Sequence, residues 1–214
     1  MVVHSGYIPL LYFQNWHLEK SRAFWRRFME EVPCTYSMCV NLDITRLYGV
    51  VKAGGYRLFA ALLYGLSRAV NRRAEFRMGL TADGEPGIYD EVHPCYTVFH
   101  PENETFTSVW QAYDPDFAAF SAAYVARDEQ AAVPPPENIF HVSCLPWVSF
   151  TGFNLNLPAG FRDLEPLFTV GRFFEQDGRL LLPLAMQLHH AACDGYHAAM
   201  FLQDLQAWMD DFAG

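Results

Sequence analysis

The sequence predicts a mixed α/β fold built around a mainly antiparallel or mixed sheet. Three observations indicate this class. Helical patterns recur through the first part of the 214 residues and close the chain, while strand patterns crowd the last third. No internal repeat and no linker divides the sequence, so residues 1–214 are expected to form a single domain.

Four stretches carry helical signals. Residues 19–31 mix charged and apolar positions and stop before Pro33, which cannot continue a helix. Residues 57–72 are apolar all round, so this helix is expected to be covered on most sides. A third helix is expected over residues 115–127 and a fourth over residues 194–212. The fourth has an apolar stripe at Phe201, Leu205, Trp208 and Phe212.

Strand signals begin at residues 40–48, which lead into a turn at Gly54 and Gly55. Residues 76–80 and 87–92 flank a polar turn and are expected to form a hairpin. The remaining strand candidates lie further along the chain, at residues 95–100, 139–145, 147–157, 166–175 and 179–188.

The composition is that of a globular protein, with 51% apolar and 18% charged residues. The net charge of −9 and the lack of a long basic run argue against a nucleic-acid partner, and an anionic ligand would need a locally basic patch. Aromatic residues reach 16%. That excess suits an oligomer interface or an apolar pocket, and it equally suits an aromatic-rich core.

The five cysteines are scattered and lack the paired short spacing of a zinc site. No stretch is long and apolar enough to span a bilayer, and the N-terminal residues do not form a secretory leader. We therefore expect a cytoplasmic protein with reduced thiols, without a membrane partner and without a bound metal.

The strongest chemical signal is QLHHAACDGYH, residues 187–197, where a strand is expected to end and the last helix to begin. Such a turn is held by rigid elements, which suits catalytic side chains. Adjacent histidines on a strand point to opposite faces, so only one of His189 and His190 can face a given pocket. Asp194 is placed to cap the helix, and Gly195 permits close backbone approach.

Chemistry alone leaves three interpretations of this segment open. A neutral imidazole can take a proton from an alcohol at physiological pH, so His190 is a candidate general base. An ordinary structural histidine is an equal alternative. A metal site combining His190, Asp194 and His197 is weaker, because the segment is not one continuous helix presenting ligands on one face.

The run HHxxxDG, residues 189–195, resembles the motif shared by chloramphenicol acetyltransferases, dihydrolipoamide acyltransferases and related CoA-dependent acyltransferases. The eleven-residue form resembles the chloramphenicol acetyltransferase version specifically. Further segments similar to that family follow in its order along almost the whole chain: PCTY at 33–36, LDIT at 42–45, EFRM at 75–78, HPCYTVFH at 93–100, ETF at 104–106, PEN at 136–138, S-x-x-PWVSF at 143–150 and FNLN at 153–156.

The resemblance implies a two-layer α/β sandwich assembled as a homotrimer, with active sites between subunits. It implies direct transfer of an acetyl group from acetyl-CoA to a hydroxyl of chloramphenicol, which gives antibiotic resistance. The segment before Pro136 is shorter than in well-known members, which keeps another small hydroxylated acceptor open. A dihydrolipoamide acyltransferase domain fits less well, since no lipoyl domain or linker is present. A non-enzymatic trimer would not need the whole set of site residues.

The resemblance also assigns catalytic roles. It makes His190 the general base and leaves His189 structural. Ser143 matches the serine that donates to the oxyanion of the tetrahedral intermediate. Thr169 matches the threonine that holds an ordered water near it.

Asp194 matches an aspartate that organises the site through a buried ion pair with an arginine of the first helix. The sequence departs from the family pattern at that arginine, so Arg22 or Lys20 is the candidate partner of Asp194. A lysine would not reproduce the two-pronged contact between an arginine and a carboxylate.

Two further sets of positions follow from the resemblance. The acceptor pocket is implied at Phe28, Cys34, Tyr36, Thr97, Phe106, Leu155 and Leu157. Contacts to CoA are implied at Arg57, Phe59, Arg172 and Phe173. The alternation of apolar residues over 153–157 supports an apolar pocket wall, although a core-facing strand explains it equally well.

Overall fold

A computed structural model describes residues 7–9, 18–127, 134–158 and 160–214. The helices are α1 (Leu18–Arg26), the short π-helix η2 (Arg27–Glu31), α2 (Thr45–Gly54), α3 (Leu58–Asn71), the short 3-10 helix η3 (Ala74–Arg77), α4 (Phe117–Ala126) and α5 (Gly195–Asp211). The strands are β1 (Tyr7–Pro9), β2 (Thr35–Asp43), β3 (Met78–Leu80), β4 (Pro86–Tyr89), β5 (His93–His100), β6 (Thr105–Trp110), β7 (Ile139–Leu145), β8 (Leu167–Gly171), β9 (Phe174–Gln176) and β10 (Arg179–His189).

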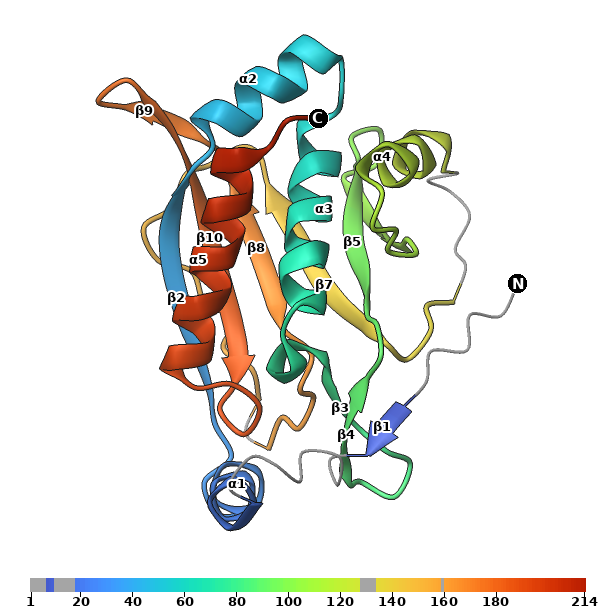
Figure 1. Cartoon of the computed structure of the whole chain (residues 1–214), viewed down its shortest axis with the longest axis vertical. Coiled ribbons are helices and arrows are strands. Elements are labelled where there is room, and N and C mark those ends of the chain that lie inside the picture. Colours follow the sequence, from blue (N-terminus) through green and yellow to red (C-terminus); the bar gives the residue numbers. More distant parts are fainter. Residues whose placement is uncertain (1–6, 10–17, 128–133, 159) are drawn as a thin grey trace.

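Seven strands form the main sheet, in the order β2-β10-β8-β7-β5-β6, with β9 paired to β10. The pairs β5–β7 and β7–β8 are parallel and the others are antiparallel. Figure 1 shows α3 and α5 side by side over one face of this sheet, with α1 at one end and α2 at the other. The α/β class and the mainly antiparallel sheet are as predicted. A separate small sheet has the order β1-β4-β3.

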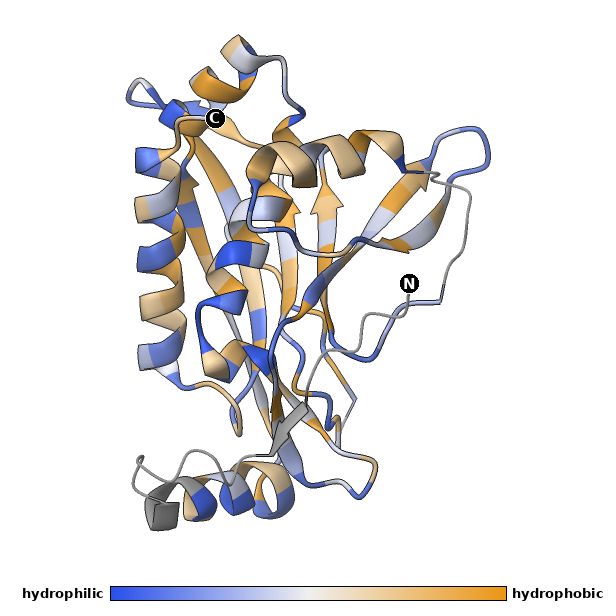
Figure 2. Cartoon of the chain, turned by 45° about the vertical axis from the view of Figure 1, so that its right-hand side comes forward, coloured by the Kyte–Doolittle hydropathy of each residue, from blue (hydrophilic) through white to orange (hydrophobic). Residues whose placement is uncertain are grey.

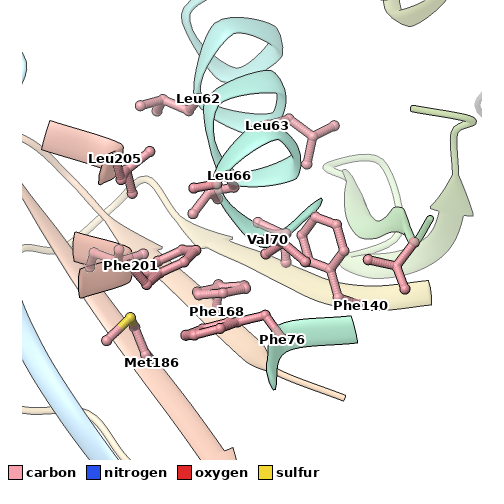
Figure 3. Packing of buried hydrophobic residues seen from close by; sticks show 14 of the residues in the cluster. Leu62, Leu63, Leu66, Val70, Phe76, Phe140, Phe168, Met186, Phe201 and Leu205 are labelled. Atoms are coloured by element: carbon pink, nitrogen blue, oxygen red, sulfur yellow. The ribbon is translucent and has the colours of Figure 1, made fainter. Parts of the chain in front are cut away.

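The face of the sheet under α3 and α5 carries the core. Phe168 and Met186 project from β8 and β10, and each is at most 2% exposed. Phe201 of α5 stacks on Phe168 at a ring distance of 5.3 Å and on Phe76 at 4.5 Å. Figure 3 shows these rings meeting the leucines of α3, and Figure 2 shows hydrophilic and hydrophobic segments alternating along α5. The stacked aromatic layer therefore joins both helices to the sheet.

Both long helices agree with their predictions. Helix α3 buries ten of its residues, because α4 and α5 flank it while it lies on the sheet. Helix α5 follows its cap Asp194 and buries Phe201 and Leu205 of the predicted stripe. Trp208 of α5 packs on Gly65 of α3, where an added Cβ would lie 2.2 Å from the indole ring. Gly65 thus allows the two helices to approach closely.

The predicted strand over residues 40–48 is wrong in its second half. The strand β2 begins earlier, at Thr35, and ends at Asp43. Oδ1 of Asp43 accepts hydrogen bonds from the backbone N–H and the hydroxyl of Thr45, at 3.0 and 2.6 Å, and the chain turns there into α2. Helix α2 ends at Gly54 and is capped by Gly55, whose positive φ of 70° suits a glycine.

The predicted strand over residues 147–157 is also wrong, since its described residues have no strand pairing. The segment instead lies on the open face of the sheet, where side chains accept its backbone N–H groups. The N–H of Phe153 donates to Sγ of Cys39 at 3.2 Å, and that of Leu155 donates to Oε1 of Gln187 at 3.2 Å. Asn156 has a positive φ of 48°, which is incompatible with an extended strand.

Smaller differences concern short strands. The predicted strand over 166–175 divides into β8 and β9 beyond Gly171. The hairpin is confirmed as β3 and β4, closed by the hydrogen bonds of Thr81 with Glu85 and of Gly84 with Thr81. The sequence patterns did not predict β1 or β6, which are edge strands of their sheets.

Candidate active site

His190 lies directly after β10, at the end of the sheet next to α1 (Figure 1). Its Nδ1 lies 3.3 Å from the carbonyl oxygen of Cys193. A carbonyl oxygen only accepts, so the proton of a neutral His190 lies on Nδ1 and Nε2 keeps its lone pair. The backbone N–H of His190 donates to the carbonyl of Cys34 at 3.0 Å, which ties the turn to β2. The imidazole is therefore oriented to accept a proton at Nε2.

Aromatic rings surround this imidazole. Phe28 stacks on His190 at a ring distance of 4.0 Å, and Phe24 and Tyr36 meet it edge-on at 5.4 Å. The Tyr36 hydroxyl is buried and accepts no hydrogen bond from the described side chains, and burial raises the pKa of this phenol. The structure thus brings the predicted acceptor residues Phe28, Cys34 and Tyr36 together around the predicted base.

His189 points away from this cage and is 2% exposed. Its Nδ1 accepts from the backbone N–H of Ala191 at 3.1 Å, and its Nε2 lies 3.3 Å from the carbonyl of Phe161. Burial lowers the pKa of His189, so this imidazole is neutral. Its contacts are those of a structural histidine.

Asp194 caps α5, with Oδ1 accepting from the backbone N–H groups of Tyr196 and His197 at 2.9 and 3.1 Å. The imidazole Nδ1 of His197 lies 3.0 Å from the same carboxylate oxygen. Among the described residues, no arginine or lysine side chain forms an ion pair with Asp194; the imidazole of His197 lies beside its carboxylate, and Arg22 is exposed. The side chain of the other predicted partner, Lys20, lies outside the described residues.

Ser143 and Thr169 lie side by side on neighbouring strands. The parallel pairing of β7 with β8 places them in register, so both side chains point to the same face of the sheet. Val142 and Phe168, the preceding residues, point into the core, so the two hydroxyls lie on the open face. Thr97 follows Tyr96, the register partner of Val142, and therefore lies beside Ser143 on that face.

A small hollow opens next to Thr169. It is lined by Phe153, Leu155, Leu167, Thr169, Ala185, Met186 and Gln187. Gln187 holds the hollow together, because its Oε1 accepts from Leu155 and its Nε2 donates to the Thr35 hydroxyl at 3.3 Å. The sequence patterns gave Gln187 and Cys39 no role, since both act by accepting backbone N–H groups of a distant segment.

The remaining predicted acceptor residues are spread out. Leu155 borders the hollow and is 48% exposed. Leu157 follows on the same segment and is half-buried. Phe106 on β6 is 54% exposed and contacts Phe99 at 5.1 Å. These side chains do not belong to the cage around His190.

The predicted CoA residues lie at the opposite end of the sheet from His190. Arg57 precedes α3 and Arg172 follows β8, and both are exposed. Figure 1 shows the start of α3 at the end of the molecule next to α2, far from α1. Phe173 contacts Tyr48 of α2 at 5.3 Å, whereas Phe59 contacts Tyr96 and Tyr124 on the other side of α3. Phe59 is therefore a packing residue within this chain.

The base and the hydroxyl pair are separated within one chain. Ala185 is the register partner of Thr169, and His190 comes five positions later on β10 and its turn. At about 3.3 Å per residue, the strand places His190 roughly 17 Å from Thr169. One copy of the chain therefore does not bring His190 to Ser143 and Thr169.

The sequence profile of the chloramphenicol acetyltransferase family matches residues 10–206. The chain belongs to the chloramphenicol acetyltransferase family. Curated family relatives include chloramphenicol acetyltransferases of Clostridium perfringens, 44% identical over 86% of this chain and 91% of the relative, and of Campylobacter coli, 44% identical over 90% and 93%. That of Escherichia coli is 41% identical over 94% of this chain and 93% of its own length.

Solved structures agree on the fold of this family. A chloramphenicol acetyltransferase superposes with a TM-score of 0.79 at 24% identity, covering 91% of this chain and 96% of its own. A dihydrolipoamide acetyltransferase of Azotobacter vinelandii superposes with a TM-score of 0.60 at 21% identity, covering 90% and 88%. The chain therefore has the acyltransferase fold expected from its HHxxxDG motif.

Three further points concern metal binding, membrane spanning and the segment before Pro136. Among the described residues, no group of three or more His, Cys, Asp or Glu side chains is arranged to hold a metal ion. None of the described helices is long and apolar enough to cross a membrane. The shortened segment before Pro136 falls largely on residues 128–133, which lie outside the described residues.

Proposed function

We propose that this chain transfers the acetyl group of acetyl-CoA to a hydroxyl of chloramphenicol and so confers resistance to the antibiotic. The observation that carries the proposal is the geometry of His190. Its Nδ1 donates to the Cys193 carbonyl, while aromatic rings of Phe28 and Tyr36 surround the imidazole. The names of relatives at 44% identity supply the acceptor.

His190 is the general base of the proposed reaction. Nε2 takes the proton of the acceptor hydroxyl while the hydroxyl oxygen attacks the thioester carbon of acetyl-CoA. Because the Nδ1 proton is held by a carbonyl, the imidazole cannot rotate to present the wrong nitrogen. A correctly placed base contributes on the order of 10²–10⁴ in rate. The transfer is direct, so no acyl-enzyme is formed.

The attack places negative charge on the former carbonyl oxygen of the thioester. In the proposal the Ser143 hydroxyl donates to this oxyanion, and the neighbouring Thr169 holds a water beside it. Their register on adjacent strands fixes the spacing of the two hydroxyls before substrate binds, which is the condition for electrostatic stabilisation. The departing CoA thiolate is protonated from the imidazolium of His190.

The proposal requires a second copy of the chain. His190 and Thr169 are separated by roughly 17 Å along the strand direction, so His190 of one copy must face Ser143 and Thr169 of another. Apolar side chains exposed on this chain support such an interface, among them Phe106, Trp147, Val148 and Leu155. We propose a homotrimer, in which each of three identical interfaces forms one site.

CoA would enter from the other end of the sheet. Arg57 and Arg172 are exposed there and supply positive charge for phosphate groups on an otherwise acidic chain. The five cysteines are free, which fits the reducing cytoplasm, where acetyl-CoA is available. We therefore propose the cytoplasm as the location of the reaction.

One observation favours a second candidate acceptor within the same family. His141 is the register partner of Leu167 and lies 3.5 Å from Glu165, and hydrogen bonds to Cys95 and Glu165 raise the pKa of His141 to about 9. A charged pair thus lies two register positions from the Ser143–Thr169 pair, on the same face of the sheet. A more polar hydroxylated acceptor would suit this neighbour better than chloramphenicol does.

Acetyl-CoA turnover, measured by the free CoA thiol that it releases, tests the proposal. Rapid turnover with chloramphenicol, abolished in His190→Ala, is the expected result. Turnover with other hydroxylated compounds alone would transfer the function to the second candidate. Thioester consumption that persists unchanged in His190→Ala would contradict the assigned base.

A further inference from the structure

Glu75 ties the turn that carries His190 to a segment 118 positions earlier in the chain. The buried thiol of Cys193 donates to the backbone carbonyl of Glu75 at 3.5 Å, and Nε2 of His197 lies 3.5 Å from the Oε1 carboxylate oxygen. Burial raises the pKa of the Cys193 thiol well above its ordinary value, so the thiol keeps the proton that it donates. Glu75 therefore holds the turn by its backbone and by its side chain.

His197 extends this contact to Asp194. Its Nδ1 lies 3.2 Å from the backbone nitrogen of Asp194, whose carboxylate in turn caps α5. A neutral His197 with its proton on Nε2 satisfies both neighbours, because Nε2–H donates to Glu75 while Nδ1 accepts from the N–H of Asp194. The side chains of His197 and Glu75 are only 14% and 19% exposed. Both imidazole nitrogens are thus engaged in fixing the turn.

The residue between these contacts orients His190. Cys193 supplies the carbonyl that accepts from Nδ1 of His190, and its own thiol is bound to Glu75. Asp194, the next residue, is bound to His197. A shift of this dipeptide would displace the imidazole, and a displacement of about 1 Å of a reacting group can cost roughly 100-fold in rate.

We propose that Glu75 and His197 act together as positioning residues for His190, and that in this chain they fulfil the organising role expected of a first-helix arginine toward Asp194. The inference rests on His190 being the base of the proposed function. Arg22 is exposed, while the described side chain beside the Asp194 carboxylate is that of His197.

The test compares kcat and KM of Glu75→Ala, His197→Ala and the double variant with those of the unmodified protein. We expect each single variant to lose ten- to one-hundred-fold in kcat, on the order of a 1 Å displacement of the base, with both KM values within about two-fold. The double variant should lose no more than the worse single variant, because residues that act as one unit are not additive. Additive losses, unchanged kcat, or effects confined to KM would overturn the proposal.

Two conservative variants separate positioning from general structural support. In His197→Asn the amide oxygen replaces Nδ1 as the acceptor for Asp194, and in His197→Gln the amide nitrogen replaces Nε2 as the donor to Glu75. Each should recover part of the kcat lost in His197→Ala. These variants, with Glu75→Gln, also decide the matter if the alanine variants do not fold, since native kcat in all three would refute the proposal.

Asp204→Asn is the matched control. Asp204 also joins α5 to the segment before η3, through an ion pair with Arg73 at 2.5 Å, but it does not touch the turn 189–194. This variant should lower the melting temperature and leave kcat unchanged. A kcat loss like that of His197→Ala would show that any loosening of α5 suffices, which would overturn a specific role for Glu75 and His197. Failure of His190→Ala to lose activity would instead refute the proposed function itself.

Discussion

The two faces of the main sheet differ in what their side chains contact. On the covered face, Phe168 and Met186 are at most 2% exposed and pack against α3 and α5. On the open face, Ser143 and Thr169 form a row of hydroxyls beside a hollow, and exposed apolar residues such as Leu155 lie nearby. The difference teaches that alternate residues of the same strands have two different roles. One set holds the chain folded, and the other set lines the open face, where we propose that a second copy completes the site.

The largest expected effect tests whether the open face forms its site with a second copy of the chain. His190→Ala and Ser143→Ala should each be nearly inactive alone. Co-expressed in equal amounts, they should assemble mixed oligomers in which roughly one quarter of the sites pair an intact His190 with an intact Ser143 from different copies. The turnover rate of the mixture is the measurement, and we expect it to be near a quarter of the native rate.

The control for the mixture is a chain that carries both substitutions, co-expressed with either single variant. Mixed with His190→Ala, no copy carries His190, and mixed with Ser143→Ala, no copy carries Ser143, so neither control mixture should recover turnover. Absence of any recovered turnover from well-formed mixed oligomers of the two single variants would place the whole site in one chain.

Phe168→Ala tests the covered face. Phe168 stacks on Phe201 and meets Phe140 edge-on at 5.8 Å, so truncation leaves a cavity at the centre of the aromatic layer. We expect a loss of about 3–5 kcal/mol in the free energy of unfolding. Urea unfolding at fixed protein concentration measures it. A loss under about 1 kcal/mol would mean that the layer contributes little to stability.

Ser143→Ala applies the complementary change on the open face of the adjacent strand. Loss of one oxyanion donor should lower kcat about 10²–10³-fold, equivalent to about 2.7–4 kcal/mol in activation free energy. The free energy of unfolding should change by no more than about 0.5 kcal/mol, as for other substitutions outside the core. Equal losses of kcat and stability would show that the two faces are not separate in function.

The smallest effect concerns pH. Hydrogen bonds to Cys95 and Glu165 raise the pKa of His141 from 6.5 to about 9. A raised pKa means that the folded state binds the proton more tightly, so this contribution is complete below pH 6.5 and is lost as the pH rises through about 9. The melting temperature should therefore fall over that interval by more in the native chain than in His141→Gln. Parallel melting curves of the two proteins would contradict the assignment.

Much of the fold follows from sequence patterns, and the exceptions have identifiable causes. The helices over 57–72 and 194–212 were predicted to within about a residue, because their apolar patterns and the cap Asp194 are local signals. The strand predicted over 147–157 failed although its alternation is real. Its backbone N–H groups donate to Cys39, more than one hundred positions away, and to Gln187, more than thirty positions away, and no local pattern reveals such partners.

The candidate site was likewise predicted in part from the sequence. The motif identified His190, and the resemblance named Phe28 and Tyr36, which the structure places around it. The partner of Asp194 was expected on the first helix, yet the described partner is His197, three residues later in the same motif. Glu75 lies in the family-like segment EFRM at 75–78, and no role was predicted for it. Its contact with Cys193 depends on how η3 packs beside α5, which sequence spacing does not encode.

The register between β7 and β8 also limits how this chain can change in length. Insertion or deletion of one residue in either strand would turn Ser143 or Thr169 toward the helices and a core residue toward the open face. A change of two residues would restore the faces but would shift one hydroxyl by about 6.6 Å relative to the other. Length variation in natural or laboratory-evolved descendants should therefore be confined to the connections outside these strands.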